Sequence, residues 1–201
     1  MRGLLIGAIL AATATGPAAA QATEPDGGPT TAALAVGDAF DYLTSHGRTL
    51  RMTLAAVEAD RFHWELHDVT ETPRLAARIT QDAEFRVLVH EDAAGGVTRY
   101  DPHNCEKMVG ICTYTVRHPD GSEADEMRVN GITQTVWNYS LWREAEGENR
   151  PVGIGEICYD AAGLSLRESW TDLESAAGYA VERILPDGTL ADCSDAAAPL
   201  E

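Results

Sequence analysis

Apolar and polar side chains alternate with a period of two along most of this chain, and this pattern restricts the fold more than any other feature. Phe62, Trp64 and Leu66 alternate with polar residues, and the segment 50–54 does the same before a polar turn. Successive side chains of a strand point to opposite faces, so such segments are typical of half-buried β-strands. The short turn between the two segments predicts a β-hairpin.

The same alternation recurs down the chain, with turn sequences such as His118-Pro119-Asp120-Gly121 between the segments. About eleven strand segments are recognisable, at the spacings of ~8–12 residues that are typical of an all-β domain. Asp172–Gly178 could form one short helical turn. We therefore expect an all-β fold, an antiparallel meander with at most one short helix in the mature chain. Because an open sheet of this size exposes its edges, the meander should form a curled half-barrel, a barrel or a sandwich.

The N-terminal residues predict export. Met1–Ala22 has the arginine, the apolar core and the small-residue cleavage site of a secretory signal peptide. Residues 23–35 are rich in Pro, Gly, Thr and Ala, which predicts a disordered leader. We expect a single β domain over residues 36–191 and a tail over residues 192–201, in a protein that is periplasmic or secreted by a bacterium.

The four cysteines all follow the predicted signal peptide, and an exported protein meets an oxidising environment. Four cysteines allow three pairings. Proximity favours a Cys105–Cys112 disulfide, which leaves Cys158–Cys193 to tether the tail to the β domain. Neither a C-x-x-C redox motif nor the paired short spacings of a zinc site is present.

Charge excludes some classes of partner. The net charge of −17 repels nucleic acid and anionic lipid surfaces. After the signal peptide, no apolar run approaches the ~18 residues that a membrane helix needs. The sequence does not identify the partner: the candidates are an apolar small molecule and another envelope protein, and the excess of carboxylates leaves a basic partner or weak divalent-cation binding open.

No catalytic residues can be assigned, because the sequence contains neither a G-x-S-x-G motif nor a Gly-rich phosphate loop. The weak candidates for a metal site are His63, Glu65 and His67, which share one face of a predicted strand. The two histidines would be about 13 Å apart along a straight strand, too far to bind the same ion. We therefore expect these three side chains to face solvent, and we expect no cofactor.

Aromatic residues are the better candidates for a binding site. Trp137 and Trp142 have opposite parity on one strand, so a regular strand cannot bury both on the same side. Leu164, Leu166 and Trp170 are predicted to share a face. The candidate ligand-lining residues are Trp64, Trp137, Tyr139, Trp142 and Trp170.

In its architecture alone, this exported meander resembles the curled half-barrels of periplasmic lipoprotein carriers and the closed barrels of lipocalins. No diagnostic motif of either family is present, so no residue roles follow from the resemblance. The favoured hypothesis is a non-enzymatic binding module for an apolar ligand or a partner segment. The alternatives are a secreted hydrolase or metal-dependent enzyme that uses His63, Glu65 and His67 or scattered carboxylates, and a structural or inhibitory protein-binding module.

Overall fold

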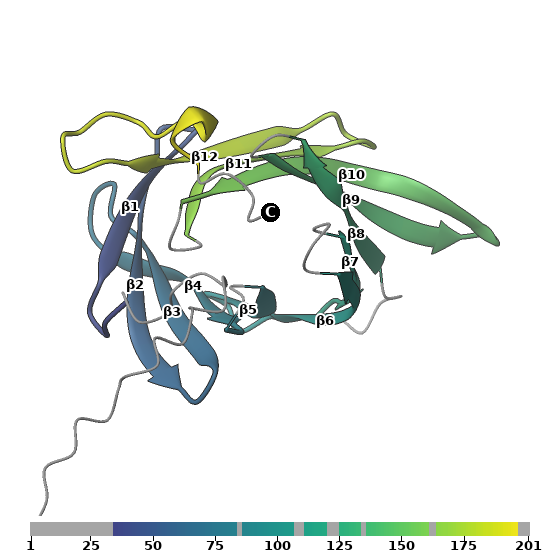
Figure 1. The fold of residues 1–201 in the computed structure, drawn as a ribbon, viewed down its shortest axis with the longest axis horizontal. Helices are drawn as coiled ribbons and strands as arrows, with labels where there is room; N and C mark the ends of the chain where they lie inside the picture. Colours follow the sequence, from purple (N-terminus) through teal and green to yellow (C-terminus); the bar gives the residue numbers. More distant parts are fainter. Residues whose placement is uncertain are drawn as a thin grey trace, which may run out of the picture.

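A single antiparallel sheet closes on itself to form a barrel (Figure 1). The computed structural model describes residues 34–83, 86–106, 111–119, 125–133, 136–160 and 164–196. The strands are β1 (Ala39–Thr44), β2 (Thr49–Glu58), β3 (Arg61–Asp68), β4 (Arg74–Gln81), β5 (Val87–Asp92), β6 (Val97–Glu106), β7 (Ile111–Arg117), β8 (Asp125–Thr133), β9 (Val136–Ala145), β10 (Glu148–Tyr159), β11 (Ser165–Asp172) and β12 (Gly178–Ile184), followed by the 3₁₀ turn η3 (Cys193–Asp195).

Each strand pairs with its neighbours in sequence, and the first strand pairs with the last. The closing register runs antiparallel from Asp41 opposite Ile184 to Thr44 opposite Val181. This confirms the predicted all-β meander and selects the barrel among its three forms, with twelve strands rather than about eleven. Among the described residues, no helix is long and apolar enough to cross a membrane.

The buried face of β2 and β3 identifies the interior of the barrel. Leu54, Phe62 and Trp64 are between 0% and 4% exposed and pack together with Leu164. Partly buried apolar side chains surround them, namely Leu34, Phe40, Met52 and Ile79. The strands β1–β4 therefore line an apolar half of the interior, as the alternation of residues 50–54 and 62–66 predicts.

Leu164 and Leu166 do not share a face, which corrects the sequence prediction. The register of β10 and β11 shifts between Cys158 and Tyr159, which pair with Arg167 and Ser165 respectively, so Leu166 is left in a β-bulge. Leu164 packs in the interior cluster, whereas Leu166 packs with Cys158 in a second cluster. Alternation fails here because one extra residue in a strand reverses the parity of everything that follows it.

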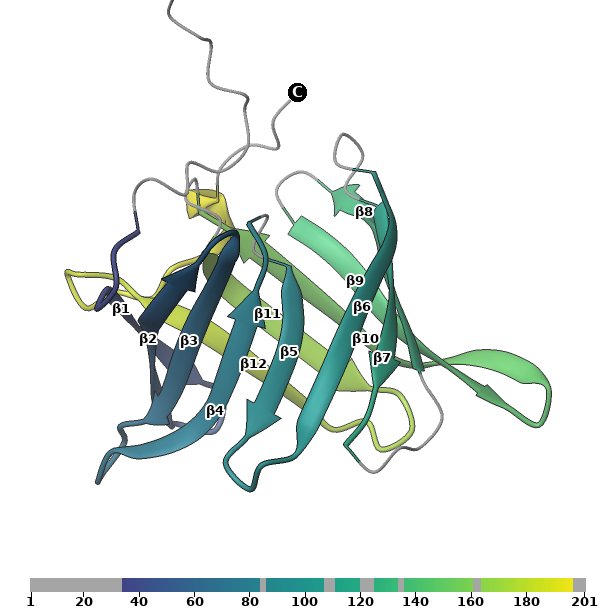
Figure 2. The same cartoon turned by 90° about the horizontal axis from the view of Figure 1, so that it is seen from below.

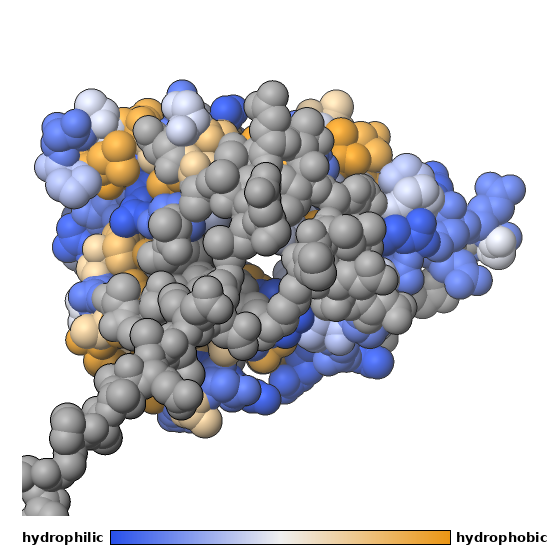
Figure 3. Space-filling model, in the orientation of Figure 1, coloured by the Kyte–Doolittle hydropathy of each residue, from blue (hydrophilic) through white to orange (hydrophobic). Residues whose placement is uncertain are grey.

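The hairpin of β9 and β10 extends away from the barrel (Figure 2). Its two-residue turn has positive φ at both positions, 57° at Glu146 and 78° at Gly147, which is the conformation that matches the twist of a β-hairpin. The surface of the projecting part is predominantly hydrophilic (Figure 3). The segment Asp172–Gly178 also forms a turn rather than a helical turn, since the Asp172 carboxylate accepts the backbone N–H groups of Glu174 and Ser175 at 3.0 and 2.7 Å.

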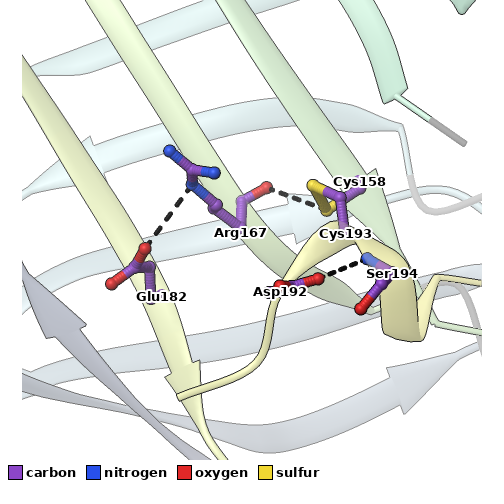
Figure 4. Close-up of a disulfide and its surroundings, with 6 residues drawn as sticks. All are labelled: Cys158, Arg167, Glu182, Asp192, Cys193 and Ser194. Atoms are coloured by element: carbon purple, nitrogen blue, oxygen red, sulfur yellow. Dashed lines mark hydrogen bonds and ion pairs between the residues drawn. A yellow bond between two sulfur atoms is a disulfide. The ribbon is translucent and has the colours of Figure 1, made fainter.

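The C-terminal segment is tethered by the Cys158–Cys193 disulfide, with the two Cα atoms 5.7 Å apart (Figure 4). This confirms the second predicted pairing. Cys158 is fully buried and packs with Leu166 and Ala191. Cys105 lies outside the residues whose side chains the structure describes, so Cys105–Cys112 stays a prediction.

Replacing both Cys158 and Cys193 with serine should lower the free energy of unfolding by up to about 3.8 kcal/mol, because the bond closes a loop of about 36 residues. Urea unfolding of the variant and of the oxidised protein measures the difference. Equal unfolding midpoints would contradict a stabilising role for this disulfide. Both proteins are unfolded under oxidising conditions, so that the predicted Cys105–Cys112 disulfide is the same in each.

Candidate functional site

One carboxyl group, that of Glu168 on β11, lies on the inward face of the barrel. Phe40 and Tyr42 share the inward face of β1, and Tyr42 pairs with Arg183 of β12. Val181 lies on the same face of β12 as Arg183, and it pairs with Glu168. None of the strand pairs along this path has a bulge. On its other side, Glu168 pairs with Ile157 of β10. The acid therefore points into the barrel together with the interior cluster.

Tyrosine hydroxyls hydrogen-bond to this carboxyl. Tyr139 on β9 donates to Glu168 Oε1 at 2.6 Å, and Tyr179 on β12 also hydrogen-bonds to Glu168. Burial raises the pKa of Glu168 above 4.5, and the two tyrosine bonds only partly oppose this. Ionisation of this carboxyl is therefore less favourable than in water.

Glu168 influences tyrosines from five different strands. Burial raises the pKa of each of these tyrosines, and the negative charge of Glu168 raises it further. They are Tyr42 on β1, Tyr100 on β6, Tyr139 on β9, Tyr159 on β10 and Tyr179 on β12. β6 and β12 lie in opposite walls of the barrel (Figure 1), so the charge of Glu168 influences tyrosines that come from both walls, although Tyr179 is itself 41% exposed. We call Glu168 and these five tyrosines the acid–tyrosine cluster.

Aromatic rings form the wall next to this cluster. Trp170 stacks on Tyr139, with ring centroids 5.7 Å apart and an interplanar angle of 16°. A β-carbon added at Gly153 would overlap the Trp170 ring, and one added at Gly155 would overlap the Tyr139 ring. The two glycines of β10 therefore let both rings lie directly on the backbone of the strand between them.

Trp137 extends the wall along β9. It pairs with Ile157, which also pairs with Glu168, so the three side chains share the inward face. Its ring meets that of Tyr159 edge to face, with centroids 6.3 Å apart. The aromatic wall thus consists of Trp137, Tyr139 and Trp170, with Tyr159 against one end.

The other buried acids of the barrel are compensated by arginine. Asp125 is 1% exposed and accepts two bonds from Arg143, both at 2.9 Å, and one from His118 at 3.0 Å. Burial opposes ionisation there, but the arginine and histidine bonds outweigh it and lower the pKa of Asp125. Asp68 is held in the same way by Arg48 and Arg74. Among the described residues, Glu168 has no such ion pair.

Three of the five predicted ligand-lining residues come together at this site. Trp137, Tyr139 and Trp170 form the aromatic wall, whereas Trp64 packs in the apolar cluster at 1% exposure. Trp142 lies on the outer face, where the Arg128 guanidinium is 4.3 Å from its ring centroid and its indole nitrogen donates to Ser140 Oγ at 2.9 Å. The opposite parity of Trp137 and Trp142 thus separates an inner from an outer residue.

The weak metal candidates lie on the outer face of β3. His63, Glu65 and His67 have 33%, 39% and 32% exposed side chains, and each alternates with an inward residue. His63 is 3.7 Å from Glu58, and His67 is 4.0 Å from Glu65. Arg78 lies 3.6 Å from Glu65 and supplies a positive charge at this surface. Among the described residues, no group of three His, Cys, Asp or Glu side chains could hold a metal ion.

Glu168 and its tyrosines are absent from the sequence-based candidates. The sequence offers one indication of this site. Glu168 and Trp170 are two residues apart on a strand, so an acid shares a strand face with an aromatic ring. An acid in an otherwise apolar row of a half-buried strand is unusual and marks a special environment. The tyrosines are dispersed over the sequence, and only closure of the barrel brings them together.

Comparisons with known proteins give little guidance. A scan against protein-family models finds no match, and a search of curated proteins finds none either. Among solved structures, the chain is similar to the crystal structure of the hypothetical lipoprotein YmcC from Escherichia coli (K12). The TM-score is 0.41 and the identity 8%, over 74% of this chain and 83% of that chain.

The Glu168→Gln variant should gain stability relative to the unmodified protein as the pH rises. A raised pKa means that the contribution of Glu168 to stability is complete below pH 4.5 and is lost as the pH rises through the folded-state pKa. The five tyrosines have pKa values raised above 10.0, so they do not titrate in this range. Urea unfolding of both proteins between pH 4 and pH 8 measures the effect. A stability difference that does not change with pH would contradict it.

Proposed function

We propose that this protein is an exported, non-enzymatic binding protein of the bacterial envelope, whose barrel holds a small molecule with an apolar body. The signal-peptide pattern and the disulfide support an extracytoplasmic location. The aromatic wall is the surface that would contact the ligand. The observation that carries the proposal is that these inward-facing rings remain partly exposed.

Closed interiors of proteins are normally packed to the density of organic crystals. The apolar half of this barrel follows that rule, since Leu54 and Trp64 are 0% and 1% exposed. Trp137, Tyr139 and Trp170 face inward from β9 and β11 but stay only half-buried. Side chains that face inward and still reach solvent are available for contact with a ligand.

Barrel size supports the same proposal. The diameter of a barrel grows with its number of strands, and an interior of about eight strands is already wide enough for side chains or one small ligand. A closed barrel of twelve strands is wider. Ligand sites are lined mainly by apolar and aromatic side chains with a few polar groups, and the half-exposed aromatic wall beside Glu168 has this composition.

Dodecanol, an uncharged molecule with an apolar chain, is a suitable first probe, and isothermal titration calorimetry measures its affinity. Replacing Trp137 with alanine should weaken binding by about tenfold, since truncating a central aromatic contact commonly costs more than ~1 kcal/mol. The matched control is Trp142→Ala, on the same strand but on the outer face, which should leave the affinity within about twofold. An equal loss in both variants would overturn the proposed function, as would the absence of binding by every dodecyl compound, charged or uncharged.

A further inference from the structure

We infer that the ligand of this barrel carries a positively charged nitrogen, an alkylammonium group, which forms an ion pair with Glu168 inside the acid–tyrosine cluster. This inference rests on the proposed function, because it assigns the polar end of a ligand whose apolar body lies on the aromatic wall. The chemical class is a cationic amphiphile with an amine or a quaternary ammonium group.

The first argument is the pattern of charge compensation. Asp125 has Arg143, Asp68 has Arg48 and Arg74, and Asp160 has Arg183 at 2.5 Å. A buried or half-buried carboxylate without a cation is costly, and this chain supplies an arginine at each of these places. At Glu168, the partners among the described residues are tyrosine hydroxyls. A positively charged ligand would supply the cation that Glu168 lacks among these partners.

The second argument is the surface around the acid. Trp170 and Tyr139 lie beside Glu168, and Trp137 and Tyr159 lie on the same inward face. The faces of aromatic rings attract cations, and quaternary ammonium groups are commonly bound among several such rings. The hydroxyls of Tyr139 and Tyr179 hydrogen-bond to Glu168 and would stabilise its ionised form once a cation is present. An anionic ligand would instead meet a like charge.

The third argument is long-range attraction. The chain has a net charge of −17, so its field concentrates cations and repels anions around the barrel. This field alone gives no specificity, because any acidic protein has it. It favours entry of the same class of ligand that Glu168 and the aromatic wall are suited to bind.

The test compares three probes with the same dodecyl chain: dodecyltrimethylammonium, dodecanol and laurate, each below its micelle-forming concentration. Calorimetry at neutral pH should give the tightest binding for the ammonium compound and the weakest for laurate. Glu168→Gln should weaken ammonium binding by at least about tenfold (about 1.4 kcal/mol). Dodecanol binding to the same variant should change by less than about threefold.

The matched control is Glu156→Gln, which removes the same charge from an exposed position on the neighbouring strand β10. It should leave ammonium binding within about twofold, since it changes the long-range field but not the interior. Equal losses of ammonium affinity in both variants would mean that removal of one negative charge anywhere on the protein weakens binding. This result would overturn the inference. Equal affinity for the ammonium compound and dodecanol would also overturn it, while leaving the proposed function in place. Failure of all three probes would overturn both.

A measurement on the unmodified protein covers the case in which the Gln variant does not fold. Affinity for dodecyltrimethylammonium should rise as the pH increases from 4 to 8, because the ion pair requires ionised Glu168. Tyr42, Tyr100, Tyr139, Tyr159 and Tyr179 are electrostatically coupled to this group and stay protonated over that range, and Arg183, on the same face of β12, is paired with Asp160. Dodecanol affinity should stay constant. A pH-independent ammonium affinity would overturn the inference.

Discussion

The pairing of β1 with β12 is the interaction on which the rest of the structure depends. Closure removes the two sheet edges and encloses one face of every strand. It brings Tyr42 and Arg183 opposite each other, and through Val181 it continues the inward face to Glu168. The apolar cluster and the acid–tyrosine cluster both span this pairing, because it brings Leu164 to Leu54 and Trp64 and brings Tyr42 near Glu168.

Within the closed barrel, the side-chain partners of each carboxylate distinguish structural from functional positions. Asp125 is almost fully buried and its charge is balanced by Arg143 and His118, an arrangement that fixes strand ends and needs nothing from outside. Glu168 sits among hydroxyls and rings that can stabilise it in either protonation state. Such an acid is less useful for holding strands together than for responding to a ligand.

Sequence reasoning predicts the strands and the all-β class because a half-buried strand must alternate. It also separates Trp137 from Trp142, since parity within one strand is a local property. It fails at Leu166, where a bulge changes the parity, and it does not find Glu168. The tyrosines that define the site come from β1, β6, β9, β10 and β12, and periodicity carries no information on which distant strands meet across a barrel.

The state of the Glu168 carboxyl tests the central claim most directly. The ¹³C chemical shift of its side chain can be followed by NMR as the pH is varied, with Glu168→Gln used to assign the signal. We expect a titration midpoint above 4.5 in the free protein, because burial without a cation favours the neutral acid. Addition of dodecyltrimethylammonium should move the midpoint down. A midpoint at or below 4.5 in the free protein would contradict an uncompensated acid inside the barrel.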